Sequence, residues 1–561
     1  MLKLYTTQYI NAQKPKQTLF QRFNIWLINT GKQRVLLGFW VFLQILCFIF
    51  AFLNYRLNPV WQSTRDLLGV SFYIARGCAM TIHVNTAIIL FPVCRTLISW
   101  VRTTFLNRVI PFDQNIAFHK VVGFSLIIFS LGHTFAHYRN FYILSKQDIP
   151  GQPGWFGWAF LSGPGFTGHV MLLVLIIMGL TSLGWIRRPH FNLFWYTHHL
   201  MFIFFGLFSV HGAFCLLKPD RPPYCSKDAA FWKYWIAGGV IYLCERLARE
   251  LRNITGKQSE ILRVVLHPGH VVEVVIRKHT RLEAKAGQYI FINCPAVSLH
   301  EWHPFTLTSS PHDDYLSVHI SMAGTWTKDF AAVLGCPMKD QNKIIESAES
   351  VVESEQTKVM EPYRIPLPRV MVDGPFGSAS EDVFDYEVTM MFGSGIGVTP
   401  FASVMKTIHH RFLSKNTESK LRKVYFFWLQ RSTHSFEWFR DLLDEIEQDF
   451  GPEYEDNPPI EIHKFFTGKL TEDKVQNLYL NTNIDDTDAL DVLTELRAKT
   501  HIGRPNLDKL FFAVRQEHPS TDVGVFFCGN PALGTNLEAA CHRWSTEGKD
   551  GTRFYFNKET F

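Results

Sequence analysis

Four histidines interrupt long apolar stretches in the first half of the chain, and they form two pairs. His119 and His133 are 14 residues apart in one stretch, and His198 and His211 are 13 residues apart in another. An ionisable side chain inside a membrane is costly and is usually functional. Imidazole binds haem iron, and each spacing covers about 20 Å of helix at roughly 1.5 Å per residue. Two such helices side by side would therefore hold two bis-histidine haems, one near each side of a membrane.

The helical periodicity supports one pair better than the other. At roughly 100° per residue, His133 returns to within about 40° of His119, whereas His211 lies about 140° from His198. We therefore expect a kink or local unwinding in the second helix, near Gly206. The neighbouring His199 would align no better, and spacing alone leaves the choice between His198 and His199 open.

Two further side chains in these stretches could act near a haem. Arg76 lies alone in an apolar run and needs an anionic partner, which a haem propionate would supply. His137 is four residues from His133, a spacing that also suits a zinc pair, but no third ligand accompanies it.

Six apolar runs are long enough to cross a bilayer. They cover residues 35–54, 68–92, 118–137, 166–186, 196–214 and 231–246. Basic residues gather before the first run, between the second and third, between the fourth and fifth, and at the end of the sixth. Because basic residues favour the cytosolic side, we expect an integral membrane protein with both termini cytosolic. His119 would then lie level with His198 near the cytosol, and His133 with His211 near the outside.

Composition and cysteine usage exclude other classes of protein. The net charge of +6 over 561 residues is mild and no basic, aromatic groove is evident, so we expect no nucleic-acid partner. The ten cysteines include no CxxC pair, which argues against iron–sulfur and structural zinc sites. Cys215 and Cys225 bracket a short loop after His211 and could form a disulfide if that loop is extracellular.

The pattern changes after about residue 250. Short alternating runs at 261–266, 271–276, 289–294 and 316–321 predict an antiparallel β-barrel, and the stretch 373–377 reads as a turn that leaves it. From Val388 onward, apolar strands alternate with amphipathic helices, as in a parallel α/β sheet. We therefore divide the chain into a cytosolic N-terminal segment (1–34), a six-span domain (35–250), a barrel domain (251–385) with an acidic, mobile insertion at about 341–362, and an α/β domain (386–561).

One motif in the barrel domain suits a flavin. The sequence HPFT at 303–306 ends a strand and is followed by small hydroxyl residues. A structural turn would explain these four letters equally well. Their position between GQY at 287–289 and GTWT at 324–327 favours flavin binding. The expected contacts are His303, Pro304, Phe305, Thr306, Thr308, Ser309, Gly324 and Thr327.

Glycine loops follow two strands of the α/β domain. Glycines after a strand let the phosphates of a dinucleotide approach a helix N-terminus. The spacing is GxGxG, which differs from the common Rossmann fingerprint. Cys528 would lie beside the nicotinamide, although a buried core thiol is the other reading. The expected contacts are Gly393, Gly395, Gly397, Thr399, Pro400, Cys528 and Gly529.

Two arginines follow predicted strands and could select the nucleotide. Arg431 follows the run at 424–429, and Arg504 lies within a Gly-Arg-Pro sequence. Arginine grips phosphate with two parallel hydrogen bonds, so either could hold a 2′-phosphate. An ordinary surface arginine is an equal reading for each.

Taken together, these motifs resemble the NADPH oxidase family, whose members join a six-span di-haem domain to a ferredoxin-reductase-like flavin dehydrogenase. The resemblance covers nearly the whole chain. The segments that carry it are FHK at 118–120, HTFAH at 133–137, FWYTHH at 194–199, IYLCERL at 241–247, EWHPFTLTSSP at 301–311, DGPFGSASEDVF at 373–384, GIGVTPFASV at 395–404, HSFEWFRDLL at 434–443 and FNKETF at 556–561.

The resemblance implies roles for the candidate residues. It gives His119 and His198 to an inner haem b, and His133 and His211 to an outer one. It sets Arg76 and His137 beside the outer haem, where oxygen would be reduced. It gives HPFT at 303–306 to FAD, with Phe561 over the isoalloxazine. The residues implied for NADPH are Gly395, Thr399, Pro400, Arg431, Arg504 and Cys528.

The implied activity is electron transfer from cytosolic NADPH through FAD and two haems to extracellular O₂, which yields superoxide. Relatives work with membrane lipid, with cytosolic activators that include a small GTPase, and with a small membrane subunit. The loop after His211 is short, as in fungal members, and Ser321 stands where many relatives have an arginine. Two other functions stay open: a ferric reductase with the same electron path, and a proton-conducting membrane protein.

Overall fold

The computed structural model describes residues 7–147, 150–214, 218–222, 224, 229–255, 258–279, 282–299, 301–336, 357–359, 367–414, 420–450, 458–468, 490–491, 493–494, 496–547 and 551–559. They form two compact units, Lys32–Glu250 and a unit that joins Met1–Gly31 to Leu251–Phe561. We call them the membrane unit and the dehydrogenase unit. Phe561, the Cys215–Cys225 pair and nearly all of the predicted insertion lie outside the described residues.

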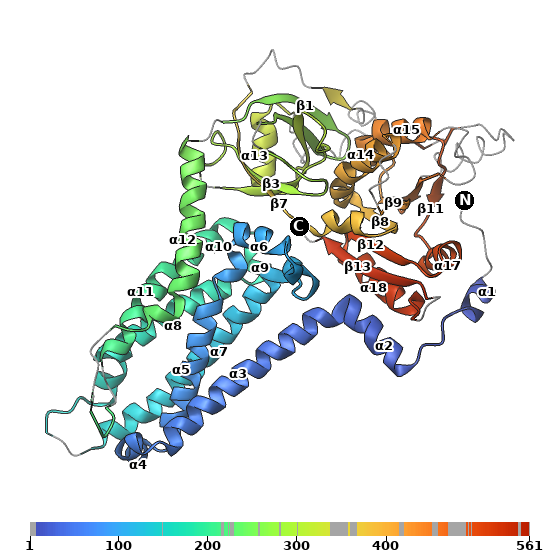
Figure 1. The fold of residues 1–561 in the computed structure, drawn as a ribbon. Helices are drawn as coiled ribbons and strands as arrows, with labels where there is room; N and C mark the ends of the chain where they lie inside the picture. The colour runs from blue at the N-terminus through green and yellow to red at the C-terminus, as the bar shows by residue number, and fades with distance from the viewer. Residues whose placement is uncertain are drawn as a thin grey trace, which may run out of the picture. The chain divides into compact units, whose positions relative to one another are not determined.

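Long helices build the membrane unit (Figure 1). Helix α5 packs between α3 and α7, and α8 packs against both α7 and α11. The principal helices are α3 (Lys32–Leu57), α4 (Gln62–Leu68), α5 (Val70–Ile88), α6 (Arg95–Arg102), α7 (Asn115–Ser145), α8 (Gly163–Thr181), α9 (Gly184–Arg187), α10 (Phe191–His198), α11 (Met201–His211) and α12 (Trp232–Thr255).

Five helical segments among the described residues are long and apolar enough to cross a membrane. They are Leu19–Leu57, Val70–Val93, Phe112–Ser145, Gly163–Thr181 and Phe191–Phe214. They coincide with the first five expected spans. The sixth expected span falls in α12, where Lys233, Glu245 and Arg246 make the helix too polar to join this set.

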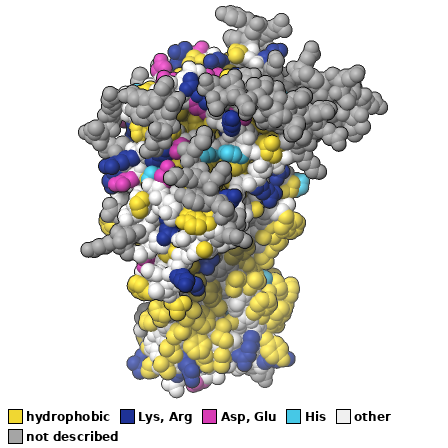
Figure 2. All heavy atoms as spheres, turned by 90° about the vertical axis from the view of Figure 1, so that its right-hand side faces the viewer, with side chains coloured by type: hydrophobic (Ala, Val, Ile, Leu, Met, Phe, Trp, Pro, Cys, Tyr) yellow, Lys and Arg dark blue, Asp and Glu magenta, His cyan; other side chains and the backbone are white. Residues whose placement is uncertain are grey.

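Large apolar side chains on these helices are exposed. Figure 2 shows hydrophobic side chains spread over the outer surface of the membrane unit. Phe50 on α3, Ile128 on α7 and Leu173 on α8 are 68%, 64% and 58% exposed. Contiguous apolar surface of this extent marks an interaction surface, and on helices of this length lipid is its natural solvent.

The expected interruption between His198 and His211 exists, but it was predicted at the wrong residue. Helix α10 ends at His198 and α11 begins at Met201, so the chain unwinds at His199 and Leu200. Gly206 lies within α11. The break frees His198 and His211 from the rotation that one continuous helix would impose.

The first part of the dehydrogenase unit is antiparallel, as the alternating runs predicted (Figure 1). Its strands form two sheets, ordered β5-β2-β1-β6 and β4-β3-β7. They are β1 (Ile261–His267), β2 (Val271–Arg277), β3 (Tyr289–Asn293), β4 (His303–Thr306), β5 (Tyr315–Ser321), β6 (Lys358–Val359) and β7 (Met371–Phe376). Helix α13 (Thr325–Val333) packs on their shared apolar core.

The predicted turn at 373–377 is wrong, because most of it belongs to strand β7. Residues Met371–Phe376 pair with β3. Pro375 lacks an amide hydrogen and Gly374 has φ of 133°, a combination that suggests a turn from sequence. The strand tolerates both because β7 lies at the edge of its sheet.

The second part is a parallel sheet in the order β11-β10-β9-β8-β12-β13 (Figure 1). Alternate residues of its strands enter two apolar cores, one against α14 and α15 and one against α17 and α18. The strands are β8 (Val388–Ser394), β9 (Lys423–Gln430), β10 (Ile460–Phe466), β11 (Thr500–Ile502), β12 (Asp522–Cys528) and β13 (Arg553–Glu559). The helices are α14 (Thr399–Leu413), α15 (Arg440–Asp449), α17 (Leu507–Glu517) and α18 (Pro531–Trp544).

The N-terminal segment, which precedes the membrane unit in sequence, packs on this parallel sheet and its helices. Helix α1 (Thr7–Ala12) buries Ile10 in the core beneath α17 and α18. The Gln17 side chain donates hydrogen bonds of 2.8 Å to the carbonyls of His542 and Ser545. No pattern in the sequence indicated this docking.

Candidate functional site

The structure brings the four intramembrane histidines together as the two predicted pairs. The ring centroids of His119 and His198 are 6.2 Å apart, and those of His133 and His211 are 6.5 Å apart. A metal–imidazole bond is about 2.0–2.1 Å and the ring centroid lies roughly 1.1 Å beyond the nitrogen, so one metal between two rings needs about 6.3 Å. Both pairs fit a bis-histidine iron.

Backbone carbonyls orient the two histidines of α7. Nδ1 of His119 donates to the carbonyl of Ile89 at 2.8 Å, and Nδ1 of His133 donates to that of Ala75 at 2.9 Å. A carbonyl accepts only from a protonated nitrogen, so Nε2 of each ring keeps its lone pair for a metal. Such outer contacts fix the tautomer and ring orientation of metal-binding histidines.

A hydroxyl plays the same part for His211. Nδ1 of His211 is 2.8 Å from Oγ1 of Thr167, and that hydroxyl donates its own proton to the carbonyl of Gly163 at 2.8 Å. Because a hydroxyl has a single proton, Oγ1 accepts from Nδ1 of His211. Thr167 lies on α8, and the sequence did not single it out.

The contacts of His199 separate it from His198. Nδ1 of His199 donates to the carbonyl of Trp195 at 2.7 Å, and Nε2 lies 3.1 Å from the Arg246 guanidinium. Both ring nitrogens of His199 are therefore engaged. His198 faces His119 instead, and its buried Nδ1 has no hydrogen-bond partner among the described residues.

Arg76 and His137 both lie near the His133–His211 pair. Arg76 interacts electrostatically with both rings of the pair and with His137. The ring of His137 contacts that of His133, with centroids 4.5 Å apart. Nδ1 of His137 is buried without a hydrogen-bond partner among the described residues.

Aromatic rings surround the Arg76 guanidinium. Its central carbon lies 5.1 Å from the ring centroid of Tyr55, 5.6 Å from that of Trp61 and 5.7 Å from that of Phe72. Cation–π attraction holds a cation in partly apolar surroundings. Its Nε is buried without a hydrogen-bond partner within the described chain, so the guanidinium can still donate to an anion.

The HPFT motif forms strand β4, which pairs with β3. The His303 ring stacks on Trp326 with centroids 4.2 Å apart, and Nε2 lies 3.2 Å from Oε2 of Glu301. Burial lowers the pKa of His303, and the contacts with Glu301 oppose that shift. Pro304 and Phe305 lie on the same strand, and Thr306 is buried at its end.

The hydroxyls that follow β4 are used inside the protein. Oγ1 of Thr308 lies 2.7 Å from Oγ of Ser317 and 3.0 Å from Nδ1 of His319. Oγ of Ser309 accepts from the backbone N–H of Ser317 at 3.1 Å. Flavin contacts from Thr308 and Ser309 stay a prediction, which their backbones could meet more readily than these hydroxyls.

Gly324 and Thr327 form the start of α13. Oγ1 of Thr327 accepts from the Gly324 N–H at 3.0 Å, which caps the helix. The N-terminal amides of a helix favour anions, so this end suits a flavin pyrophosphate. Phe561 lies outside the described residues, but β13 ends at Glu559, whose carboxylate accepts from the N–H and hydroxyl of Ser380.

The two glycine loops meet at the carboxyl ends of β8 and β12. These strands are parallel neighbours, and Gly393 pairs with Cys528. The chain winds away from β8 through β9 to β11 on one side and through β12 to β13 on the other. Ligands of open α/β sheets bind in the crevice at such a topological switch point.

Backbone geometry explains the glycines in these loops. Gly395 has φ of 60° and Gly529 has φ of 145°, both in the region that L-residues avoid. A Cβ on Gly397 would lie 2.5 Å from the Cys528 carbonyl oxygen. Thr399 and Pro400 begin α14, where proline needs no hydrogen-bond donor.

The two candidate arginines lie at the same edge of the sheet. Arg431 follows β9 and Arg504 follows β11, and both side chains are exposed. Cys528 differs, because it is buried at the end of β12. Burial raises the pKa of the Cys528 thiol, with a smaller contribution from Glu559, so the thiol stays protonated and unreactive at neutral pH.

Family models match three successive parts of the chain. Residues 84–209 match the "Ferric reductase like transmembrane component", 257–380 an "FAD-binding domain" and 386–542 the "Ferric reductase NAD binding domain". The class of protein is therefore a ferric-reductase-like transmembrane component joined to a flavin and nicotinamide dehydrogenase.

Full-length relatives narrow the class further. A superoxide-generating NADPH oxidase heavy chain of Dictyostelium discoideum is 36% identical, over 98% of this chain and 99% of its own. NADPH oxidase 1 of Mus musculus is 34% identical over 96% of this chain and 95% of its own, and NADPH oxidase 3 of Homo sapiens is 33% identical over 96% and 99%. The chain belongs to the NADPH oxidase family.

Proposed function

We propose that this protein is an NADPH oxidase that carries electrons from cytosolic NADPH across a membrane to O₂ and produces superoxide. The observation that carries this proposal is the presence, in one chain, of two histidine pairs at iron-bridging separation and a dehydrogenase with nucleotide-binding loops. The full-length similarity to superoxide-generating relatives supports it.

Four histidines would hold two haems b, His119 with His198 and His133 with His211. Strand β4 and the start of α13 would hold FAD, with Phe561 over the flavin ring. The loops after β8 and β12, with Arg431 and Arg504, would hold NADPH. When bound, FAD accepts hydride from NADPH and the haems carry single electrons.

Arg76 and His137 would act at the end of the path, beside the His133–His211 pair. Superoxide is an anion, so a fixed positive charge and a hydrogen-bond donor favour its formation. The aromatic residues around Arg76 keep the guanidinium in place without neutralising it. His137 has a free ring nitrogen at the same site.

Both termini would be cytosolic. The N-terminal segment packs on α18 and β13 within the dehydrogenase unit, which supports one side of the membrane for both. The basic residues before the first span support the cytosolic side. We expect membrane lipid around the helices, and a small membrane subunit with cytosolic activators, including a small GTPase, as partners.

The test uses the purified full chain, loaded with haem and FAD in lipid nanodiscs. NADPH should reduce the haems without oxygen, and in air it should drive cytochrome c reduction that superoxide dismutase inhibits. Reduction of Fe(III) without superoxide as a product would identify a ferric reductase instead. Failure of NADPH to reduce any haem would contradict the electron path, and activity that appears only with a partner protein would establish that requirement.

A further inference from the structure

Two histidines and a glutamate share one face of the sheet β5-β2-β1. Glu273 on β2 lies directly opposite His319 on β5 and opposite Val265 on β1. His267 is two residues beyond Val265, so its side chain points to the same face. The other face of these strands carries the apolar core.

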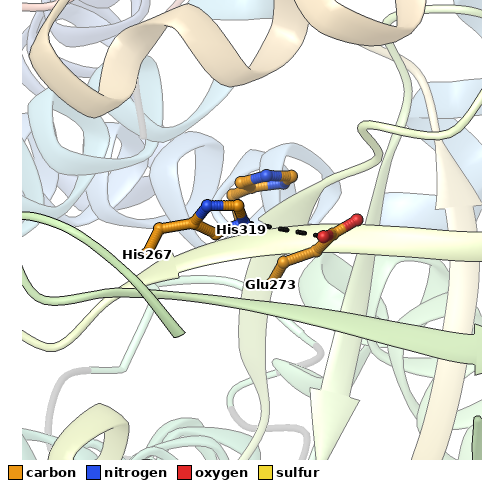
Figure 3. Close-up of side chains that lie close together, drawn as sticks. All are labelled: His267, Glu273 and His319. Carbon is orange, nitrogen blue, oxygen red and sulfur yellow. Dashed lines mark ion pairs between the residues drawn. The ribbon is translucent and has the colours of Figure 1, made fainter. Parts of the chain in front are cut away.

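These three side chains converge, as Figure 3 shows. Nε2 of His267 is 3.6 Å from Oε2 of Glu273, and one ligand atom from each residue lies within 4.8 Å of the others. Ligands of a tetrahedral zinc at about 2.0–2.1 Å are roughly 3.4 Å apart. Small side-chain rotations would therefore close the group around one ion.

Hydrogen bonding leaves part of this cluster unsatisfied. His267 is 8% exposed, and neither of its ring nitrogens has a hydrogen-bond partner within the described chain. The separation from Glu273 exceeds normal hydrogen-bond length. A buried polar atom without a partner in a native fold calls for an explanation such as an ion.

The remaining contacts suit a metal ligand at His319. Nδ1 lies 3.0 Å from Oγ1 of Thr308, which leaves Nε2 toward the cluster. The main chain of Trp438 also approaches this imidazole, and the ring of Phe439 covers it with centroids 4.5 Å apart. A hydrogen-bonded, covered imidazole is the usual state of a metal-binding histidine.

We propose that His267, Glu273 and His319 form a binding site for Zn²⁺. Two imidazoles and one carboxylate are a zinc ligand set that leaves a fourth position for water. The single carboxylate offsets one of the two charges of the ion, while Arg263 and Lys406 lie close enough to act on the cluster electrostatically and weaken binding. The site should therefore bind zinc reversibly.

The experiment measures zinc in the purified, FAD-loaded full chain after chelation and dialysis against Zn²⁺. Elemental analysis should find one zinc equivalent more in the unaltered chain than in the His267→Gln, His319→Gln double variant or in Glu273→Gln. His312→Gln, in the same domain, should lose none. His409→Gln should also lose none, because it disrupts a separate group with Glu445 and Asp449. Flavin content reports whether each variant folds.

Equal zinc in the unaltered chain and in the FAD-retaining double variant would overturn the proposal, as would no zinc in the unaltered chain. If the variants lose FAD, the zinc K-edge X-ray absorption of the unaltered chain at one equivalent decides, since haem iron does not contribute there. Two imidazoles and oxygen around zinc support the site, and sulfur ligands or a single imidazole contradict it.

Discussion

The two units place their candidate groups in different ways. In the membrane unit, each ligand is one side chain, and a contact from a neighbouring segment orients it, as Ala75 does for His133 and Thr167 for His211. In the nucleotide-binding part, the candidate contacts are mainly backbone at the ends of β8 and β12. A site of single side chains has no substitute for any of them, whereas a backbone site shares its ligand among many groups. Substitutions should therefore act abruptly in the membrane and gradually in the dehydrogenase.

The largest effect should come from His133→Leu or His211→Leu. Each variant removes one side of an iron-bridging pair, so we expect the loss of one of two haem equivalents and of all superoxide output. Haem content by pyridine haemochrome and superoxide formation are the measurements. His199→Leu is the matched control and should keep both haems, because its ring nitrogens contact Trp195 and Arg246. Two haems and full activity in His133→Leu would refute the ligand assignment.

Arg76→Ala and His137→Ala should have the next largest effect. Removing one preorganised donor to a developing anion costs about 10²–10³ in rate. Haem spectra and NADPH-driven haem reduction should persist, while stopped-flow reoxidation by O₂ slows. The exposed Arg56 on α3 is the control. Haem loss in Arg76→Ala would show that Arg76 only anchors a propionate, and unchanged reoxidation in both variants would remove them from the oxygen site.

Arg431→Ala tests the graded behaviour of the dehydrogenase. Losing a charge-assisted hydrogen bond costs about 1.5–3 kcal/mol, so the KM for NADPH should rise roughly 10- to 100-fold at about 1.4 kcal/mol per tenfold. The KM for NADH should hardly change. Arg422→Ala is the control, since Arg422 precedes β9 and Arg431 follows it. Equal changes for both nucleotides would argue against a 2′-phosphate contact.

The smallest effect should come from Gly395→Ala. Open space surrounds a Cβ at this position, so only the φ of 60° is strained. An L-residue pays about 1–2 kcal/mol in this conformation, and the thermal midpoint of FAD release should fall accordingly. Asparagine tolerates the same conformation, so Gly395→Asn should lie between alanine and the unaltered chain. No difference between the two variants would show that strain is not the cause.

Sequence patterns were sufficient wherever a local rule sets the structure. Alternation located β1, β2, β3 and β5, and apolar runs located β8, β9 and β12. The pairing of His119 with His198 and of His133 with His211 also followed from spacing and orientation. Each of these depends on residues close together in the chain or on a helix period.

What the sequence could not predict depends on distant partners. The orienting contacts of Ile89 and Thr167 come from other helices, and no pattern around the histidines encodes them. The aromatic residues around Arg76 come from α5, α3 and the segment between α3 and α4. The interruption at His199 rather than Gly206 shows that tertiary packing, not glycine content, set the helix break.

The N-terminal segment bears on how the protein is made. Strand β13 is at the edge of its sheet, and Oδ1 of Asn29 accepts from the Phe556 N–H at 2.7 Å. An unprotected strand edge is a template for pairing with other chains. The segment that shields this edge is synthesised long before β13, with the whole membrane unit between them. The ribosome therefore releases the dehydrogenase unit with these two parts still to be joined, and a fragment that starts after Gly31 should aggregate rather than fold as an independent module.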